Sequence, residues 1–300
     1  MKASLKKSVK GHAAAVYCLI KDEVDHRLFS GSSDRMVGSW SMSDLEPGAF
    51  SVNVGLPVFS LFKKDNAMLI GQGEGGIHVL DLSSKKELRH LKYHSRPVFE
   101  IFENQKTNHL YSLGGDGNLA IIDSEDYRLL WSIPLSSDKL RTGLIFDEGK
   151  KILIGGSDGY IRVLETEYYN VIEEFMGHEG GVYDMKFISA STIVSGGRDG
   201  HLRYWKQEGN AIKADRAIPA HNYAIYSIDL SPDGRRFASG SRDKTVKVWN
   251  IAEPDKPLRI ARKGPVGHTH SVNVVRWIDS ETLVSAGDDR DLYFWSISGS

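Results

Sequence analysis

The chain has 300 residues, of which 40% are hydrophobic, 26% charged and 10% aromatic. It can therefore bury a core and is not expected to be intrinsically disordered. Its 38 basic and 39 acidic residues nearly cancel, which argues against binding nucleic acid through excess positive charge. With no apolar run of about 18 residues, no secretory signal and one cysteine, Cys18, the sequence predicts a cytoplasmic protein.

Short glycine blocks recur along the chain, and each block ends in an acidic residue. The seven acids are Asp34, Glu74, Asp116, Asp158, Asp199, Asp243 and Asp289. The residues six positions after them are Trp40, Leu80, Ile122, Leu164, Trp205, Trp249 and Trp295. Upstream of five of the acids stand His12, His94, His178, His221 and His268, which Val54 and Ser136 replace in the second and fourth units. Successive acids are 40 to 46 residues apart, and seven such units indicate a repeat architecture.

Within each repeat the sequence predicts strands only. In the sixth repeat we expect strands over 224–230, 235–239 and 245–249, with turns at 231–234 and 240–244, and a fourth strand over 257–261. Apolar residues in these segments alternate with polar ones, as in half-buried strands. We find no long stripe of helical period and no flexible linker, so we expect almost no helix and a single domain over residues 1–300.

The combination of Gly-His, Ser-Gly-Ser-x-Asp and a strand-closing Trp resembles the WD-repeat β-propeller family. The marks include Gly11-His12, Gly177-His178, Gly267-His268 and Val248-Trp249-Asn250, in which Asn replaces the final Asp. The resemblance covers residues 2–300. It implies an all-β, seven-bladed β-propeller with four antiparallel strands per blade around a central channel.

The phase of the repeat predicts how the ring closes. The chain ends after the third strand of the seventh repeat, and the segment 3–9 precedes the first Gly-His pair. This segment can supply the missing outer strand of the last blade, which would satisfy backbone groups that an open ring leaves unpaired.

Histidine, serine, aspartate and tryptophan recur together, and a Ser/His/Asp set invites a hydrolase interpretation. An active site is not repeated around a ring, however, and the resemblance implies a structural hydrogen-bond network in each blade. The complete sets, called tetrads below, are His12/Ser30/Asp34/Trp40, His178/Ser195/Asp199/Trp205, His221/Ser239/Asp243/Trp249 and His268/Ser285/Asp289/Trp295.

Two further motifs have simpler explanations. The segment Gly71-Gln-Gly-Glu-Gly-Gly76 matches G-x-G-x-x-G, but a strand pattern follows it where a dinucleotide site needs a helix. The pair His268 and His270 has no third metal ligand nearby in the sequence. We therefore predict no catalytic residue, no metal and no cofactor.

Two classes of position are expected on the face that propellers commonly use for partners. The first is the fifth residue after the histidine position, occupied by Tyr17, Phe59, Phe99, Arg141, Tyr183, Tyr226 and Asn273. The second flanks the repeat acid and contains Arg35, Arg198, Arg242, Lys244 and Arg290. Aromatic residues and arginine are typical of protein-binding hot spots. The competing interpretation is that the rings fill wedges between blades and the arginines are solvated.

The sequence thus favours a non-catalytic scaffold that presents this aromatic and arginine-rich face to a protein or peptide partner. An acidic partner fits the arginines best, and neither a membrane nor nucleic acid is expected. The alternative is a propeller that binds a small molecule or carbohydrate, because an aromatic-lined cup can stack a sugar or nucleobase. An enzyme is a third hypothesis, but the sequence offers no catalytic group.

Overall fold

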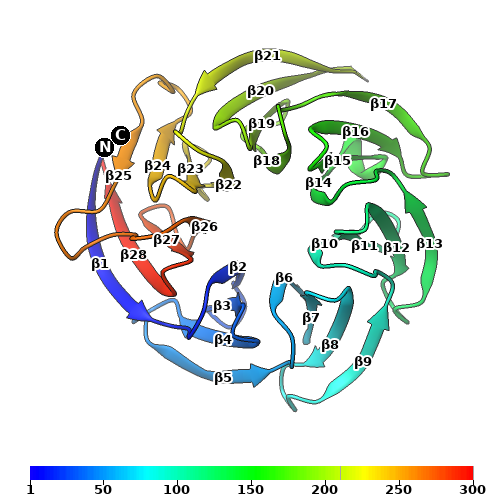
Figure 1. The fold of residues 1–300 in the computed structure, drawn as a ribbon, viewed down its shortest axis with the longest axis horizontal. Coiled ribbons are helices and arrows are strands. Elements are labelled where there is room, and N and C mark those ends of the chain that lie inside the picture. The colour runs from blue at the N-terminus through cyan, green and yellow to red at the C-terminus, as the bar shows by residue number, and fades with distance from the viewer. Residues whose placement is uncertain (210, 300) are drawn as a thin grey trace.

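Seven four-stranded antiparallel sheets form a ring in the computed structural model, which describes residues 1–209 and 211–299 (Figure 1). Within these residues the only helical element is a 3₁₀ turn, η1 (Asp147–Gly149). The structure confirms the all-β, seven-bladed β-propeller. No helix in the described part of the chain is long and apolar enough to cross a bilayer.

In blades one to six the strands run in sequence order from the channel outwards, and in blade seven the N-terminal strand takes the outermost place. Blade one contains β2 (Val16–Asp22), β3 (Arg27–Ser32), β4 (Met36–Ser41) and β5 (Pro47–Asn53). Blade two contains β6 (Val58–Lys64), β7 (Ala67–Gln72), β8 (Gly76–Asp81) and β9 (Glu87–Lys92). Blade three contains β10 (Val98–Asn104), β11 (His109–Gly114), β12 (Asn118–Asp123) and β13 (Leu129–Pro134).

The remaining blades repeat this order. Blade four contains β14 (Leu140–Phe146), β15 (Lys151–Gly156), β16 (Tyr160–Glu165) and β17 (Val171–Met176). Blade five contains β18 (Val182–Phe187), β19 (Thr192–Gly197), β20 (His201–Glu208) and β21 (Ala211–Pro219). Blade six contains β22 (Ile225–Leu230), β23 (Arg236–Ser241), β24 (Val246–Asn250) and β25 (Leu258–Ile260). Blade seven contains β26 (Val272–Trp277), β27 (Thr282–Gly287), β28 (Asp291–Ser298) and β1 (Lys2–Lys10).

The N-terminal strand closes the ring, as the repeat phase predicts. Strand β1 pairs antiparallel with β28, from Lys2 opposite Ser298 to Lys10 opposite Asp291. Leu5 packs against the core cluster that contains Trp295, and Lys6 Nζ donates a hydrogen bond to Thr282 Oγ1 at 2.7 Å. Both ends of the chain therefore lie in the same blade (Figure 1).

The core lies between neighbouring blades rather than at one centre. One cluster joins Val16 and Leu19 of blade one to Val284 and Phe294 of blade seven, and six similar clusters occupy the other interfaces. Each sheet buries apolar side chains on both of its faces, because a neighbouring blade covers each one. This explains why the second strands are nearly continuous in burial, as in β15 and β27.

The glycine motif of residues 71–76 adopts the predicted strand–turn–strand structure. Strand β7 ends at Gln72, and β8 begins at Gly76, so no helix follows the loop. The turn holds Gly75 at φ 86°, a conformation that glycine adopts without strain. A Cβ at this position would also approach the His94 carbonyl oxygen to 2.3 Å. Close backbone packing, rather than phosphate binding, accounts for the glycine.

Candidate functional site: the channel mouth

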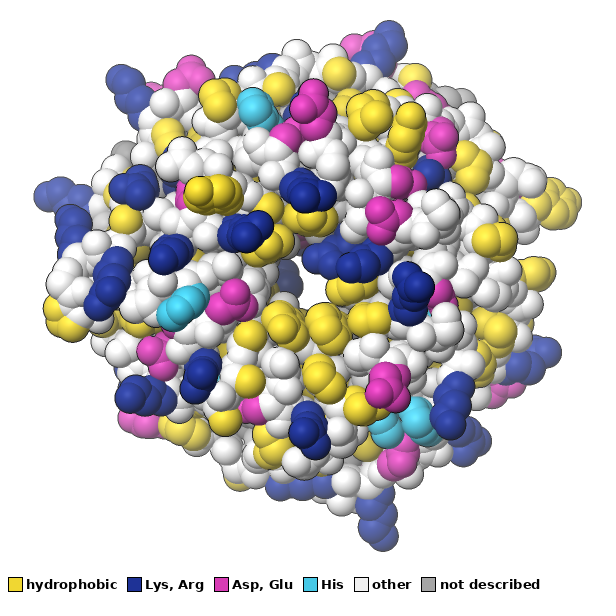
Figure 2. Space-filling model, in the orientation of Figure 1, with side chains coloured by type: hydrophobic (Ala, Val, Ile, Leu, Met, Phe, Trp, Pro, Cys, Tyr) yellow, Lys and Arg dark blue, Asp and Glu magenta, His cyan; other side chains and the backbone are white. Residues whose placement is uncertain are grey.

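A cavity of about 460 Å³ opens at one end of the central channel. Seven of its eight lining residues are the members of the first position class, which the sequence analysis placed on the partner face. The lining comprises Tyr17, Phe59, Phe99, Arg141, Tyr183, Tyr226, Asn273 and Asp288. We call this set the mouth. Figure 2 looks onto this end, where hydrophobic side chains border the central opening and Lys and Arg side chains stand around it.

A β-bulge places each of these side chains at the mouth. Every mouth residue of the first class is the second residue of its innermost strand, and the register between first and second strands shifts across it. In blade one, for example, Val16 pairs with Ser32 and Cys18 with Gly31, which leaves Tyr17 as the extra residue. A bulge bends its strand and redirects a side chain. The same local irregularity, repeated seven times, therefore builds one ring of side chains.

The rings of the mouth pack against one another from blade to blade. Tyr17 and Phe59 are stacked with centroids 4.8 Å apart, and Phe59 meets Phe99 edge to face at 5.6 Å. Across the opening, Tyr183 and Tyr226 lie 5.6 Å apart. All five of these aromatic side chains remain partly exposed. Mutual packing thus fixes the rings while leaving part of each surface available to a ligand.

Arg141 occupies the gap between the two groups of rings. Its guanidinium carbon lies 4.1 Å from the centroid of Phe99 and 4.9 Å from that of Tyr183. Burial lowers the pKa of Arg141, although an arginine remains protonated at neutral pH. Within residues 1–209 and 211–299 its guanidinium makes no ion pair or hydrogen bond, and only cation–π contacts hold it. The mouth thus carries a fixed positive charge with unused hydrogen-bond donors.

The side of the mouth formed by blade seven is different. Asn273 Nδ2 donates to Asp288 Oδ1 at 2.7 Å and to the Val16 carbonyl oxygen at 3.1 Å. The bond to Val16 ties the last blade to the first, and Asp288 places a carboxylate at the rim. The mouth is therefore polarised, with a cation at blade four and an anion at blade seven.

The arginines of the second position class lie outside the cavity. Arg198 and Arg242 are exposed on the turns between second and third strands and do not line the mouth, and Arg242 approaches the ring of Tyr223 instead. The basic residue after the repeat acid is conformationally unusual in three blades, where Arg35, Lys244 and Arg290 have φ between 70° and 73°. The four other blades have glycine at this position. A non-glycine residue in this region is uncommon and strained.

Acidic side chains deeper in the channel connect successive blades, which the sequence analysis missed. Glu100 accepts a hydrogen bond from Gly143 N at 2.6 Å, and Asp229 accepts one from Trp277 N at 2.7 Å. Asp184 accepts one from Ile228 N at 2.6 Å. Each acid follows a mouth residue in the innermost strand by one to three positions, and an acid at that place in the innermost strand is the signal that could have revealed it.

Glu100 gives this channel a pH-dependent element. Burial raises the pKa of Glu100 from 4.5 to about 7. The positive charge of Lys186 opposes this shift, and the negative charge of Asp184 adds to it. Between these values the folded protein keeps a proton that the unfolded chain has lost, so stability falls as pH rises through this window. Above pH 7 Glu100 is ionised in both the folded and the unfolded protein, so its destabilising contribution no longer changes with pH.

We expect the Glu100→Gln variant to lose this pH dependence. The free energy of unfolding of the native protein, minus that of the variant, should fall as pH rises from about 4.5 to about 7 and then level off. Urea unfolding at pH 5, 6, 7 and 8 measures the difference. An exposed acid such as Glu125 provides the control, because Glu125→Gln should show no such slope. A difference that stays constant from pH 5 to 8 would contradict the assignment.

The four tetrads each form a continuous chain of hydrogen bonds. In blade five, Trp205 Nε1 donates to Ser195 Oγ at 2.8 Å, Ser195 Oγ lies 2.7 Å from His178 Nε2, and His178 Nδ1 lies 2.9 Å from Asp199 Oδ1. Equivalent contacts join the tetrads of blades one, six and seven. Each donor finds an acceptor when the histidine is neutral and carries its proton on Nδ1.

The serine is the centre of every tetrad. Its hydroxyl oxygen accepts the hydrogen bond of the tryptophan Nε1 at 2.8 Å in Ser30, 2.9 Å in Ser239 and 2.8 Å in Ser285. The same three oxygens lie 2.7, 2.8 and 2.8 Å from the Nε2 atom of their histidines. The hydroxyl proton is thus directed to the histidine while the oxygen accepts from the tryptophan, so both functions of each hydroxyl are used internally.

The tetrad serines, which the resemblance assigns to a structural network, are not accessible from the surface. Ser30, Ser195, Ser239 and Ser285 all have an exposed fraction of 0%. They lie in the second strands of their blades, where neighbouring blades cover both faces of the sheet. A substrate or partner cannot reach these hydroxyls in this structure, so none of them is the accessible nucleophile that a hydrolase needs.

The protonation states of the tetrads agree with this arrangement. Burial lowers the pKa of His178, which favours the neutral ring. Burial opposes ionisation of Asp199, but the hydrogen bonds that it accepts, above all from His178, hold its pKa well below its usual range. In blade five the aspartate is therefore the charged end of the chain and the histidine a neutral link.

Blades two, three and four depart from the complete tetrad in different ways. Blade three keeps the chain through His94, Ser112 and Asp116 but has Ile122 in place of tryptophan. In blade four, Ser136 Oγ donates to Asp158 at 2.6 Å. The position of the tetrad serine is isoleucine in blades two and four, namely Ile70 and Ile154, and both isoleucines belong to core clusters. Hydrophobic packing therefore replaces the polar network there.

Seven bulged blades, four of them with buried Trp-Ser-His-Asp chains, define a WD-repeat propeller. The chain belongs to the WD40 family, whose model, described as "WD domain, G-beta repeat", matches residues 3–41, 169–206, 213–250 and 262–296. The matched segments include the four complete tetrads. Residues 42–168, between the first and second matches, hold most of the three blades whose tetrads are incomplete.

Relatives share the repeat at low identity. The chain is 25% identical over 275 residues to Polycomb group protein FIE1 of Oryza sativa subsp. japonica, covering 75% of this chain and 70% of the relative. It is 27% identical over 167 residues to a ribosome biogenesis protein WDR12 homolog of Drosophila persimilis, covering 50% of this chain and 40% of the relative. It is 21% identical over 304 residues to a 66 kDa stress protein of Physarum polycephalum, covering 97% of this chain and 48% of the relative. The chain thus spans less than half the length of the last two.

Proposed function

We propose that this propeller is a non-catalytic interaction scaffold whose mouth binds an acidic side chain of a protein or peptide partner. Residues 1–300 act as one domain in this proposal. The observation that carries it is Arg141, a half-buried cation without an ionic partner in the described residues, held between Phe99 and Tyr183. A carboxylate inserted into the mouth would accept hydrogen bonds from this guanidinium.

The setting of Arg141 favours such a contact. The aromatic rings already hold the guanidinium, so little side-chain entropy remains to be lost on binding. Their packing against the guanidinium also lowers the local dielectric, which strengthens a charge-assisted hydrogen bond made there. The rings of Tyr17 and Tyr226 add apolar surface for the rest of the inserted residue.

The strained basic residues support the same face. Arg35, Lys244 and Arg290 adopt a backbone conformation in which glycine would cost less, yet each places a cation on a turn at this end of the ring. Strain of this kind is informative where it coincides with a candidate binding surface. These cations would draw an acidic segment toward the mouth from a distance, which affects the rate of association more than the affinity.

Selection from a displayed peptide library tests the preference for acidic residues. Peptides that the native protein enriches should contain Asp or Glu beside an apolar residue, and the best of them can be measured by calorimetry. We expect Arg141→Gln to weaken the binding of that peptide by more than about 1.4 kcal/mol, which is roughly a tenfold loss of affinity. Tyr226→Ala and Phe99→Ala should each reduce the binding free energy of the peptide by more than about 1 kcal/mol.

The control is Arg128→Gln, which removes an exposed arginine on an outer turn of blade three and should leave affinity unchanged. Melting curves of every variant separate lost binding from lost folding. Enrichment of basic peptides, or equal affinity of the native protein and Arg141→Gln, would refute the proposal. If the aromatic variants unfold, the rings serve blade packing instead.

The cavity volume favours a second candidate, the binding of a small molecule or carbohydrate. About 460 Å³ lies within the range of small-molecule sites, and ring faces can stack a sugar. Thermal-shift screening with a panel of sugars and nucleotides tests it. A shift that Phe59→Ala abolishes would favour this function over a peptide partner.

A further inference from the structure

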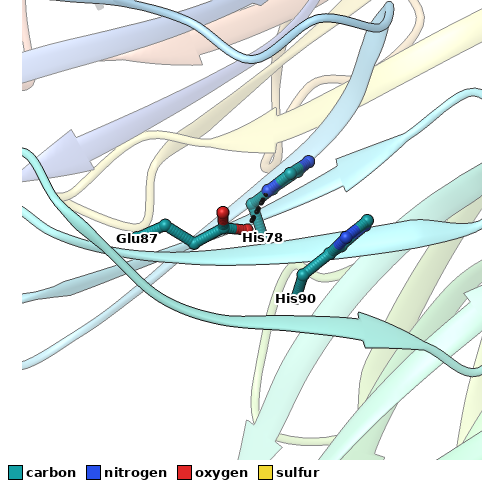
Figure 3. Close-up of side chains that lie close together, drawn as sticks. All are labelled: His78, Glu87 and His90. Carbon is teal, nitrogen blue, oxygen red and sulfur yellow. Dashed lines mark hydrogen bonds and ion pairs between the residues drawn. The ribbon is translucent and has the colours of Figure 1, made fainter.

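Blade two carries a cluster of two histidines and a glutamate on its two outer strands. His78 lies in β8, and Glu87 and His90 lie in β9 (Figure 3). One ligand atom from each of the three residues lies within 4.8 Å of the others. The cluster lies on the outer part of the blade, away from the channel, because β8 and β9 are its third and fourth strands.

The strand register builds this cluster. His78 and His90 are directly opposite each other in the antiparallel pair, and their rings are parallel with centroids 4.2 Å apart. The register then shifts, so that Leu80 lies opposite Glu87. This irregularity turns Glu87 to the same face of the sheet, where its Oε1 lies 2.5 Å from His78 Nδ1. Figure 3 shows both rings projecting from the two strands with the carboxylate beside them.

The neighbouring residues leave room for the histidines. A Cβ at Gly76 would lie 2.7 Å from His90 Nε2, so the glycine provides the space that the imidazole occupies. Gln72 Oε1 borders the same space and is buried without a hydrogen-bond donor among the described residues. A metal-bound histidine usually donates its other ring N–H to an oxygen. His90 Nε2 and Gln72 Oε1 both border the space beside Gly76, so we assign the other ring nitrogen of His90, Nδ1, to the metal.

We propose that His78, His90 and Glu87 form a zinc-binding site with an open coordination position. Two imidazole nitrogens and one carboxylate oxygen are ligands that Zn²⁺ prefers, and three protein ligands leave the fourth tetrahedral position for water or another group. A metal on His78 Nδ1 requires the neutral tautomer whose proton is on Nε2, so a proton now on Nδ1 would move to Nε2 by exchange through solvent, and Glu87 would then face the metal. His90 and Glu87 are exposed, so the metal can enter directly.

This blade differs from its neighbours in a way that accommodates the site. At the position of His78, the blades with complete tetrads have Gly38, Arg203, Lys247 and Tyr293. Arg203 in blade five pairs with the tetrad acid Asp199 at 3.2 Å. Blade two has no tetrad, and Glu74 lies exposed on its turn. The side chain at position 78 is thus available to a partner on β9.

Calorimetric titration of the chelator-treated protein with ZnCl₂ tests the site. We expect one strong binding event in the native protein. His78→Ala and His90→Ala should each weaken it at least about tenfold, and Glu87→Gln should weaken it by a smaller factor. The matched control is His270→Ala, an exposed histidine of blade seven, which should bind as the native protein does. Zinc should also raise the melting temperature of the native protein but not that of the double variant His78→Ala/His90→Ala.

Two results would overturn the proposal. One is native zinc affinity equal to that of the double variant. The other is strong binding that all three cluster variants retain, which would place the metal elsewhere. Because the three side chains lie on the outer strands, the variants are expected to fold, and the melting curves without zinc verify this.

Discussion

Removal of residues 1–10 is expected to lower the melting temperature by roughly 10 °C. The deletion exposes β28 along its whole length and removes the apolar contacts of Ala3, Leu5 and Val9 with two core clusters. Burial of one large aliphatic side chain is worth about 1.5–3 kcal/mol, and each kcal/mol shifts the midpoint of a domain this size by about 2 °C or more. Thermal denaturation followed by circular dichroism measures the effect.

A matched variant distinguishes pairing from mere chain length. Ser4→Ala/Ser8→Ala keeps the strand and changes only outward-facing side chains, so its midpoint should equal that of the native protein. Leu5→Asp keeps the length but loses the packing, and its midpoint should fall between those of the native protein and the deletion. An unchanged midpoint in the deletion would refute the role of β1 in closing the ring.

The tetrads predict a second large effect, in which Asp199→Ala is far more destabilising than Glu74→Ala. Asp199 accepts hydrogen bonds from His178 Nδ1, His201 N and Arg203 Nη2, so its loss leaves buried donors unpaired at a cost of roughly 1–3 kcal/mol. Glu74 is exposed, and its blade has valine and isoleucine in place of the histidine and serine. Urea midpoints of the two variants measure the difference, provided that the slope of the unfolding free energy with urea is unchanged.

The pH sets the conditions for this comparison. The pKa of Asp199 is below its ordinary value in the folded protein, so its contribution is complete above the unfolded pKa and is lost only as pH falls toward the folded one. The experiment therefore belongs at pH 7. Equal losses in the two variants would mean that the tetrads do not stabilise their blades as proposed.

The repeat phase carried most of the fold prediction. In blade six the predicted strands 224–230, 235–239, 245–249 and 257–261 differ from β22 to β25 by no more than two residues at any end. The same phase placed all seven mouth residues of the first class, because equivalent positions in a ring of equivalent blades share one radius and one height. The fifth residue after the histidine position could therefore be placed on one ring from the repeat alone. The sequence contains no direct sign of the β-bulge that turns these side chains toward the mouth.

Features that depend on a single blade were not predictable in this way. His78 and His90 are twelve residues apart in the sequence and meet only through strand register, and Glu87 joins them through a local shift in that register. The sequence analysis considered a pair in blade seven instead, whose histidines are close in the chain. Likewise, Arg141 breaks the aromatic pattern of its class, and its unpaired charge follows from neighbours that only the three-dimensional structure identifies.

The pairing of β1 with β28 also has a consequence for the order of folding. These strands stand almost 300 positions apart, so the contact that completes the last blade is the least local in the molecule. On the ribosome, β1 must remain without its partner until β28 has been made, while the blades between them can form hairpin by hairpin. For that interval β1 is an unprotected edge, and its sequence, with Lys2, Lys6, Lys7 and Lys10 among nine residues, carries the charges that discourage pairing with other chains.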